Sequence, residues 1–293
     1  MRTEPSTPFS SGTEYENFTY YFCERCKKGK LNEDGSSNKN RLGVAGETAE
    51  NKDNGEVSNM ILYGKPVADA LREQYAERIE ENAWQQTLTV LVDGSEDPQY
   101  LAAIRKEAER WKIHVQCSDC MSDAYIETHV IDICECATEV GMHSVDGQSV
   151  WGRAGAYEGE IYRDTPCTAE AIIRMLDYYN IPIAGRHAVV IGRSERVGKP
   201  TAMLLLARDA TVTVCHSKTD KGKLLELVAG ADIVVCASGQ KGLIDWTCVP
   251  HGCTVINVGG DYYDEYDRSL NLIPFKGGVG PVTTAVLMSH VLM

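Results

Sequence analysis

The sequence has no long run of apolar residues and relatively few basic side chains. Its 293 residues carry 29 Lys and Arg against 42 Asp and Glu, which gives a formal net charge of −13. Because a membrane-spanning helix needs roughly 18 or more consecutive apolar residues, we expect no membrane span. Binding to nucleic acid needs clustered Lys and Arg, so the acidic balance argues against a nucleic-acid partner. A local basic pocket for a small anion remains compatible with this balance.

The N-terminal residues also lack the basic and apolar regions of a secretory signal peptide, so we expect a cytoplasmic protein. The 11 cysteines fit reduced thiols better than a disulfide framework. Pairs at Cys23/Cys26 and Cys117/Cys120, with Cys134 and Cys136, could supply thiolates to zinc. These pairs lie far apart in segments of different character, so we expect no metal site.

Residues 1–59 contain little that could form a core. Between Leu31 and Asn59 there is almost no large apolar side chain, so burial cannot offset the entropy lost on ordering. We expect residues 1–59 to be a disordered extension.

From Met60 onward, helical and strand patterns alternate. In the first half, these patterns predict helices at residues 67–79 and 100–112 and strands at residues 87–92 and 113–116. In the second half, they predict helices at residues 168–179, 199–208 and 221–228 and strands at residues 187–191, 211–215, 232–237 and 254–258. We therefore expect an α/β protein with a smaller N-terminal α/β catalytic domain at residues 60–150. Residues 151–280 should form a Rossmann-type, doubly wound parallel sheet, and residues 281–293 a helix that packs back on the first domain.

The segment from Val190 to Pro200 lies where such a fold binds phosphate, after its first strand and before a helix. Gly192 permits a tight turn and Gly198 permits close packing of the helix, whose N-terminus offers free N–H groups. This context favours dinucleotide binding over a plain structural turn.

The end of the next strand indicates which dinucleotide binds. An acidic residue there would accept a hydrogen bond from the ribose 2′-hydroxyl of NAD. Residues 215–219 are instead Cys-His-Ser-Lys-Thr, and Arg193 lies in the preceding loop. These cationic and hydroxyl groups suit a 2′-phosphate, so the sequence favours NADP.

Four motifs, at residues 182–194, 210–219, 231–239 and 277–283, resemble the methylenetetrahydrofolate dehydrogenase/cyclohydrolase (FolD) family. The resemblance is dense over residues 165–285 and looser over residues 60–150. It implies NADP-dependent oxidation of 5,10-methylenetetrahydrofolate to the methenyl form in one-carbon metabolism, and a homodimer. In bifunctional members, hydrolysis to 10-formyltetrahydrofolate follows in the same cleft.

The resemblance also implies site residues. The implied cofactor contacts are Gly192, Arg193, Ser194, Ser217, Cys167, Thr168 and Gly259. The implied folate contacts are Tyr100, Asp146, Gly277, Gly278, Val279, Gly280 and Pro281. Tyr100 would pack on the pterin and Asp146 would bind its amino group, and both would be catalytic residues.

The chain departs from the family on the folate side. The lysine of the family's Tyr-x-x-x-Lys motif is replaced by Ile104, which can neither donate nor accept a proton. The Gln-Leu-Pro strand is missing between Asp123 and Asp146. Because hydride transfer depends mainly on the orientation of the nicotinamide ring against the folate methylene carbon, we expect dehydrogenase activity with weak or absent cyclohydrolase activity.

Two alternative functions stay open. One is a degenerate homologue that binds NADP without folate turnover and acts as a regulatory or partner subunit. The other is an enzyme that oxidises a different small substrate.

Overall fold

The computed structural model describes residues 60–92, 98–119, 129–132, 165–244, 246–262 and 270–293. The chain divides into two units, Met1–Ser58 and Asn59–Met293, and every described residue belongs to the second unit. The expectations for residues 1–59 and for Asp146 fall outside the described residues. The proposed division of residues 60–293 into domains stays a prediction.

The first half contains a three-stranded parallel sheet in the order β2-β1-β3. Its strands are β1 (Thr87–Val92), β2 (His114–Asp119) and β3 (His129–Asp132). Helix α4 (Pro98–Arg110) connects β1 to β2 and buries Ile104, Glu107 and Ala108, which share one helical face. Two further helices, α2 (Gly64–Gln74) and α3 (Ala76–Glu81), precede this sheet in the chain.

The sequence between Asp123 and Asp146 lacks the family's Gln-Leu-Pro motif, yet a strand does lie in this stretch. Strand β3 pairs in parallel with β1, from Leu88 opposite His129 to Leu91 opposite Asp132. The sequence His-Val-Ile-Asp contains two β-branched residues, which favour an extended backbone. A strand therefore forms in this stretch without the Gln-Leu-Pro sequence.

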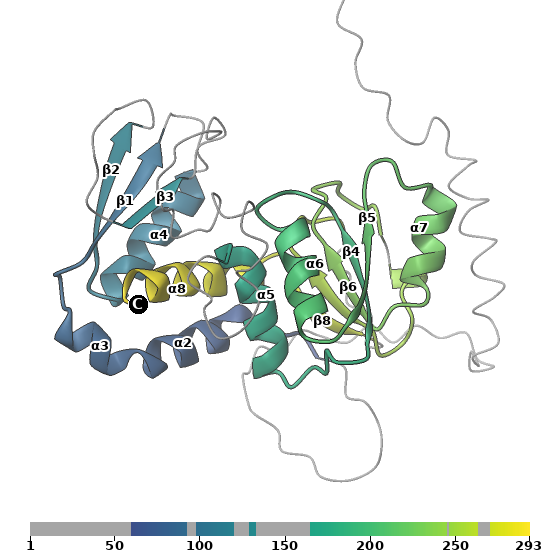
Figure 1. Ribbon diagram of the computed structural model, residues 1–293, viewed down its shortest axis with the longest axis horizontal. Coiled ribbons are helices and arrows are strands. Elements are labelled where there is room, and N and C mark those ends of the chain that lie inside the picture. The colour runs from purple at the N-terminus through teal and green to yellow at the C-terminus, as the bar shows by residue number, and fades with distance from the viewer. Residues whose placement is uncertain (1–59, 93–97, 120–128, 133–164, 245, 263–269) are drawn as a thin grey trace, which may run out of the picture. The chain divides into compact units, whose positions relative to one another are not determined.

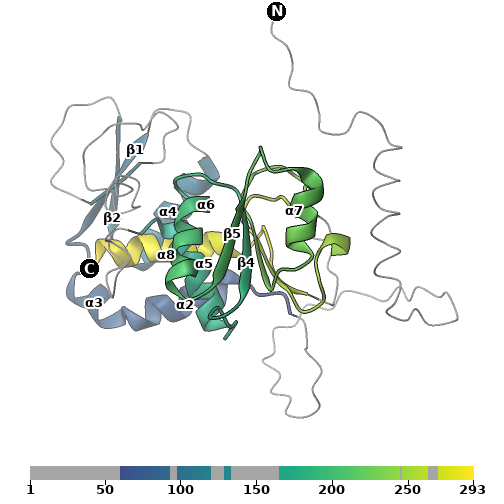
Figure 2. The ribbon, with the colours of Figure 1, turned by 45° about the vertical axis from the view of Figure 1, so that its right-hand side comes forward.

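The second half contains a five-stranded parallel sheet in the order β5-β4-β6-β7-β8. Its strands are β4 (His187–Ile191), β5 (Thr211–Cys215), β6 (Ile233–Cys236), β7 (Thr254–Asn257) and β8 (Asn271–Ile273). Its connections include α6 (Gly198–Ala207), α7 (Lys221–Val228) and the short 3₁₀ helix η3 (Trp246–Cys248). Helices α6 and α7 lie on opposite faces of the sheet (Figures 1 and 2). This arrangement confirms the predicted Rossmann-type doubly wound sheet, with the addition of the short strand β8.

The first strand of this sheet, β4, lies between β5 and β6. The chain therefore leaves β4 toward one side of the sheet and later returns to build the other side. Ligands of doubly wound sheets bind in the crevice at such a reversal, at the carboxyl ends of the strands. The expected ligand-binding crevice therefore lies among the loops after β4, β5, β6 and β7.

Helix α8 (Val279–Val291) connects the two halves of the core. It packs against α2, α4 and α5 (Cys167–Tyr178), and residues 282–291 are all buried. A mainly apolar helix that is buried on all sides is typical of a position inside a core. Among the described residues, no helix is long and apolar enough to cross a membrane.

Candidate functional site

The loop after β4 makes backbone contacts that leave no room for a side chain at two glycines. Gly192 has a φ of +132°, and a Cβ at this residue would lie 2.3 Å from the carbonyl oxygen of Ala237. A Cβ at Gly198 would lie 2.3 Å from the carbonyl oxygen of Gly192. The loops after β4 and β6 therefore touch through their main chains, as close phosphate-binding turns do.

The N-terminus of α6 faces this loop. The Oγ atom of Ser194 accepts hydrogen bonds from the main-chain N–H groups of Val197 (3.2 Å) and Gly198 (3.3 Å). Arg193 and Ser194 are exposed, and Lys199 forms an ion pair with Glu195. The start of α6 thus combines a positive helix end with nearby basic side chains, an arrangement that suits phosphate.

The loop after β5 is a tight turn held by its own side chains. Thr219 Oγ1 accepts a hydrogen bond from the His216 N–H (2.9 Å), and His216 Nδ1 accepts one from the Lys218 N–H (3.2 Å). Ser217 is exposed at this turn. Asp220 Oδ1 accepts a hydrogen bond from the Lys223 N–H (3.0 Å), so the first carboxylate after β5 caps α7.

Asp261 links the loops after β6 and β7, and sequence reasoning missed it. Its side chain is fully buried, and Oδ2 accepts a hydrogen bond of 2.6 Å from the Ser238 N–H. Burial raises the pKa of this carboxyl group, while hydrogen bonds from Ser238 act in the opposite direction. A Cβ at Gly259 would lie 2.7 Å from Asp261 Oδ1. The signal available in the sequence was a carboxylate two residues after a glycine at a strand end.

The glycine loop before α8 packs on the start of α2. The Gly64 N–H donates to the Gly277 carbonyl (2.8 Å), and a Cβ at Gly64 would lie 1.9 Å from the Gly278 carbonyl oxygen. Tyr63, which sequence reasoning also missed, is 50% exposed, and its ring lies 3.6 Å from the Cβ position of Gly277. The predicted folate loop therefore has an exposed aromatic ring beside it. Its remaining predicted residues, Val279, Gly280 and Pro281, begin α8.

The other predicted residues are distributed over two helices. Cys167 and Thr168 form the first turn of α5, where Cys167 is buried and Thr168 is partly buried. Tyr100 lies in the first turn of α4 and packs partly buried against the core. Ile104, one turn later, is completely buried in that core.

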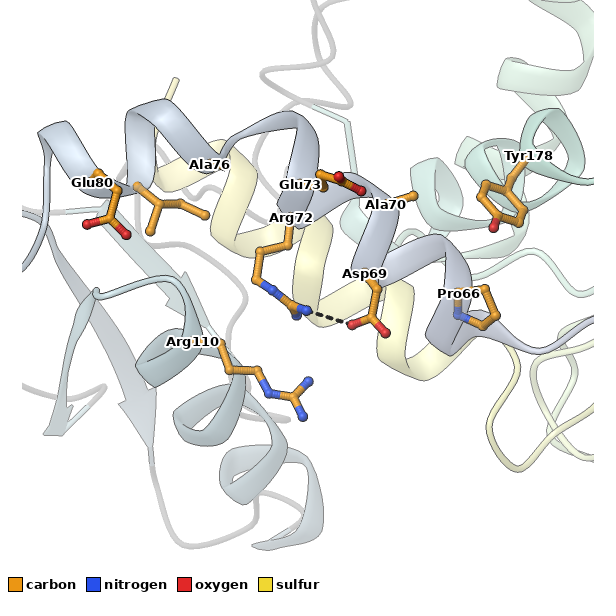
Figure 3. Close-up of a pocket in the computed structure, with 10 residues that line it drawn as sticks. Pro66, Asp69, Ala70, Arg72, Glu73, Ala76, Glu80, Arg110 and Tyr178 are labelled. Carbon is orange, nitrogen blue, oxygen red and sulfur yellow. Dashed lines mark hydrogen bonds and ion pairs between the residues drawn. The ribbon is translucent and has the colours of Figure 1, made fainter. Parts of the chain in front are cut away.

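A pocket of about 700 Å³ lies along α2 and α3, apart from these residues (Figure 3). It is lined by Pro66, Asp69, Ala70, Arg72, Glu73, Ala76, Ile79, Glu80, Arg110 and Tyr178. Arg72 and Asp69, which both lie on α2, form an ion pair of 2.7 Å in one wall of the pocket. Since none of the predicted site residues lines this pocket, the candidate site is the group of strand-end loops. Among the described residues, no group of three or more His, Cys, Asp or Glu side chains could hold a metal ion.

Comparisons with known proteins show the family of this chain. Residues 166–293 match the family model described as tetrahydrofolate dehydrogenase/cyclohydrolase, NAD(P)-binding domain. The bifunctional protein FolD of Nocardia farcinica is 34% identical over 279 residues, covering 80% of this chain and 97% of that protein. The FolD of Methanosarcina mazei is 45% identical over 139 residues, covering 44% of this chain and 48% of that protein.

Solved structures show the same fold. A 5,10-methylenetetrahydrofolate dehydrogenase from the silkworm Bombyx mori has a TM-score of 0.67 and 27% identity, covering 80% of this chain and 96% of that chain. The Trypanosoma brucei FolD, complexed with NADP cofactor and inhibitor, has a TM-score of 0.70 and 24% identity, covering 81% of this chain and 97% of that chain. The relatives and the matching cofactor-domain model confirm the resemblance seen in the motifs, and this chain belongs to the tetrahydrofolate dehydrogenase/cyclohydrolase (FolD) family.

Proposed function

We propose that this protein is an NADP-dependent 5,10-methylenetetrahydrofolate dehydrogenase with weak or absent cyclohydrolase activity. The observation that carries the dehydrogenase assignment is the close main-chain contact at Gly192 and Gly198, beside the N-terminus of α6 in a member of the FolD family. Because Gly192 and Gly198 have no Cβ, a pyrophosphate can closely approach the main-chain N–H groups at these two positions.

The preference for NADP rests on Asp220. Its carboxylate caps α7 and is therefore engaged away from the ribose-binding role of an acidic residue after β5. Exposed Arg193 and Ser217 are available to bind a 2′-phosphate. The loops after β6 and β7, joined by Asp261, then lie on the nicotinamide side of β4.

NADP⁺ supplies the hydride acceptor when it is bound. The protein's own contribution is to bind and orient. In the proposed site, Thr168 and Gly259 contact the nicotinamide half of the cofactor, and Gly277 to Pro281, Tyr100 and Asp146 contact the folate. Hydride transfer from the methylene carbon requires no protein acid or base, so the reaction depends on the alignment of the two bound molecules.

Weak cyclohydrolase activity is inferred from Ile104. The side chain is 0% exposed and belongs to the apolar core, so this position supplies neither a charge nor a proton. The same observation supports the second candidate function, a homologue that binds NADP but does not turn over folate.

Absorbance of NADPH formed from NADP⁺ and methylenetetrahydrofolate tests the dehydrogenase. Gly198→Ala should abolish the signal, because its Cβ would overlap the Gly192 carbonyl oxygen. Gly230→Ala is the matched control, since the nearest atom to its Cβ would lie 3.8 Å away. If the wild-type protein gives no substrate-dependent signal, calorimetry that detects NADP binding but no folate binding would favour the second candidate.

By family resemblance we also propose that the protein is a homodimer. A monomeric mass in analytical ultracentrifugation would contradict this proposal.

A further inference from the structure

A buried row of polar side chains joins α5 to α8. Cys167 Sγ lies 3.8 Å from His290 Nδ1, and His290 Nε2 lies 2.7 Å from Glu170 Oε2. Arg174 Nε donates to the other oxygen of Glu170 at 2.6 Å. Cys167, His290 and Glu170 are 4%, 3% and 0% exposed. Nothing in the proposed hydride transfer uses the thiol or the imidazole.

The contacts determine which nitrogen of His290 carries the proton. Glu170 forms an ion pair with the Arg174 guanidinium, and the carboxylate of an ion pair can only accept hydrogen bonds. The short contact to Glu170 therefore requires N–H at His290 Nε2. In the neutral imidazole, the lone pair of Nδ1 then faces the sulfur of Cys167.

This arrangement allows the thiol proton to move to His290 without a change in total charge. When the thiol and the imidazole are both neutral, the charges of Glu170 and Arg174 cancel and the total charge of the row is zero. After transfer, the charges along the row alternate as thiolate, imidazolium, carboxylate and guanidinium, and again sum to zero. Cys167 is also the first residue of the 12-residue helix α5, and a helix N-terminus stabilises a thiolate.

We propose that Cys167, His290 and Glu170 form a nucleophilic thiol site for small uncharged electrophiles. The roles are those of a nucleophile, its base and the residue that orients the base. In alkylation, Cys167 Sγ forms a bond to the electrophilic carbon, the leaving group departs with the electron pair of its bond, and the thiol proton stays on His290 Nδ1. The small exposed fraction of Cys167 restricts the site to compact reagents.

Covalent modification of Cys167 should also affect the binding of NADP. Thr168 follows Cys167 in the first turn of α5 and is a proposed contact of the nicotinamide half. A group added to the sulfur should displace this turn and weaken NADP binding. This consequence, unlike the reactivity of the thiol, rests on the proposed function.

Alkylation of the native full-length chain by iodoacetamide, followed by peptide mass spectrometry, tests the proposal. Cys236 and Cys253 serve as internal references, because burial raises the pKa of Cys236 well above its usual value and that of Cys253 to about 12. At mildly acidic pH, where an ordinary thiol is only about 1% thiolate, we expect Cys167 to react at least tenfold faster than either reference. A Cys167 rate equal to theirs would overturn the proposal without any variant.

His290→Gln should slow the alkylation of Cys167 at least tenfold, because the amide can still donate to Glu170 but cannot take the thiol proton. His187→Gln is the matched control: this histidine is also hydrogen-bonded on both ring nitrogens, to Gly230 O and Thr213 Oγ1, and should leave the rate unchanged. Glu170→Gln should slow alkylation less than His290→Gln does. An unchanged rate in folded His290→Gln would overturn the role of the base. The alkylation is repeated with NADP present, which should slow the reaction of Cys167. If Cys167 reacts equally fast with and without NADP, the thiol site stands and the contact of Thr168 with the cofactor fails.

Discussion

The carboxylate of Asp261 accepts a 2.6 Å hydrogen bond from the main-chain N–H of Ser238. This bond joins the end of β7 to the loop after β6, and that loop in turn contacts Gly192 through Ala237. Three strand-end loops of the proposed cofactor site are therefore in contact, and one buried acidic side chain joins two of them.

Replacement of this acid should loosen the nicotinamide side of the site. In Asp261→Asn the amide oxygen can still accept from the Ser238 N–H, but the charge assistance is lost, so we expect the KM for NADP to rise roughly fivefold. The ratio of NADP to NAD affinity should stay constant, because the 2′-phosphate binds at the opposite end. Asp232→Asn is a matched control: Asp232 accepts from the His187 N–H at the other end of β6, and its loss should leave the KM unchanged. A changed cofactor ratio in Asp261→Asn would contradict this assignment.

Because Asp261 is buried, we also expect the difference in stability between Asp261→Asn and the wild-type protein to depend on pH. Burial raises its pKa in the folded state, so the folded protein disfavours the ionised form relative to the unfolded chain. The protonated acid therefore stabilises the fold at low pH, and this contribution is lost as pH rises through the raised pKa. Asn is neutral at every pH, so Asp261→Asn should gain stability relative to wild type at neutral pH and lose that gain below about pH 4. Thermal unfolding at several pH values measures this difference, and a gain that grows in acid would refute it.

Charge reversal at Arg193 tests the 2′-phosphate contact. Arg193→Glu should weaken NADP binding roughly tenfold or more and leave NAD binding nearly unchanged, because only NADP presents the extra phosphate. Arg186→Glu makes the same charge change at the other end of β4, where Arg186 pairs with Asp232, and should affect both cofactors little. Calorimetric titration of each variant with both cofactors gives the comparison; an equal loss for both in Arg193→Glu would argue against the contact.

Asp220 should behave as a helix cap. Asp220→Ala removes the acceptor for the Lys223 N–H and should lower the free energy of unfolding by about 1 kcal/mol. Denaturant titration measures this loss. Asp220→Asn keeps the acceptor and is the control. If Asp220→Ala instead selectively weakens NAD binding, the carboxylate is a ribose ligand and the argument for NADP fails.

We expect a lysine at position 104 to lower the stability of the fold and not to restore cyclohydrolase activity. Ile104 is fully buried among apolar side chains, so Ile104→Lys leaves an ammonium group without water and should cost several kcal/mol of stability. Ile104→Met keeps the volume and should cost less than about 1.5 kcal/mol. We expect no cyclohydrolase activity in folded Ile104→Lys, measured as loss of methenyltetrahydrofolate absorbance. Activity there would mean that the missing lysine alone limits hydrolysis.

The features that could be predicted from the sequence are those that depend on residues close together in the chain. Gly192 and Gly198 were identifiable because a strand, a tight turn and a helix follow one another within a short segment. Strand β8 escaped prediction because three residues carry too little pattern, and β3 because its motif differs from that of the family.

The missed side chains act over long separations. Glu170 and His290 are 120 residues apart, and Ser238 and Asp261 are 23 apart. No local pattern indicates that such residues meet, since their contact depends on helix packing and strand order. Tyr63 was missed for the same reason, because the start of α2 meets the glycine loop only in the folded chain. The joint approach of Tyr100 and Asp146 to one folate stays a prediction.

The position of α8 has a consequence for folding during synthesis on the ribosome. Helices α2 and α4 emerge early, yet a large part of their apolar surface is covered by residues 279–291, which are translated more than 150 residues later. Until then, the nascent first half should remain incompletely packed and should depend on chaperones that shield apolar surface. Contacts of such long sequence separation also slow folding, so we expect the final docking of α8 to limit the rate at which native protein accumulates.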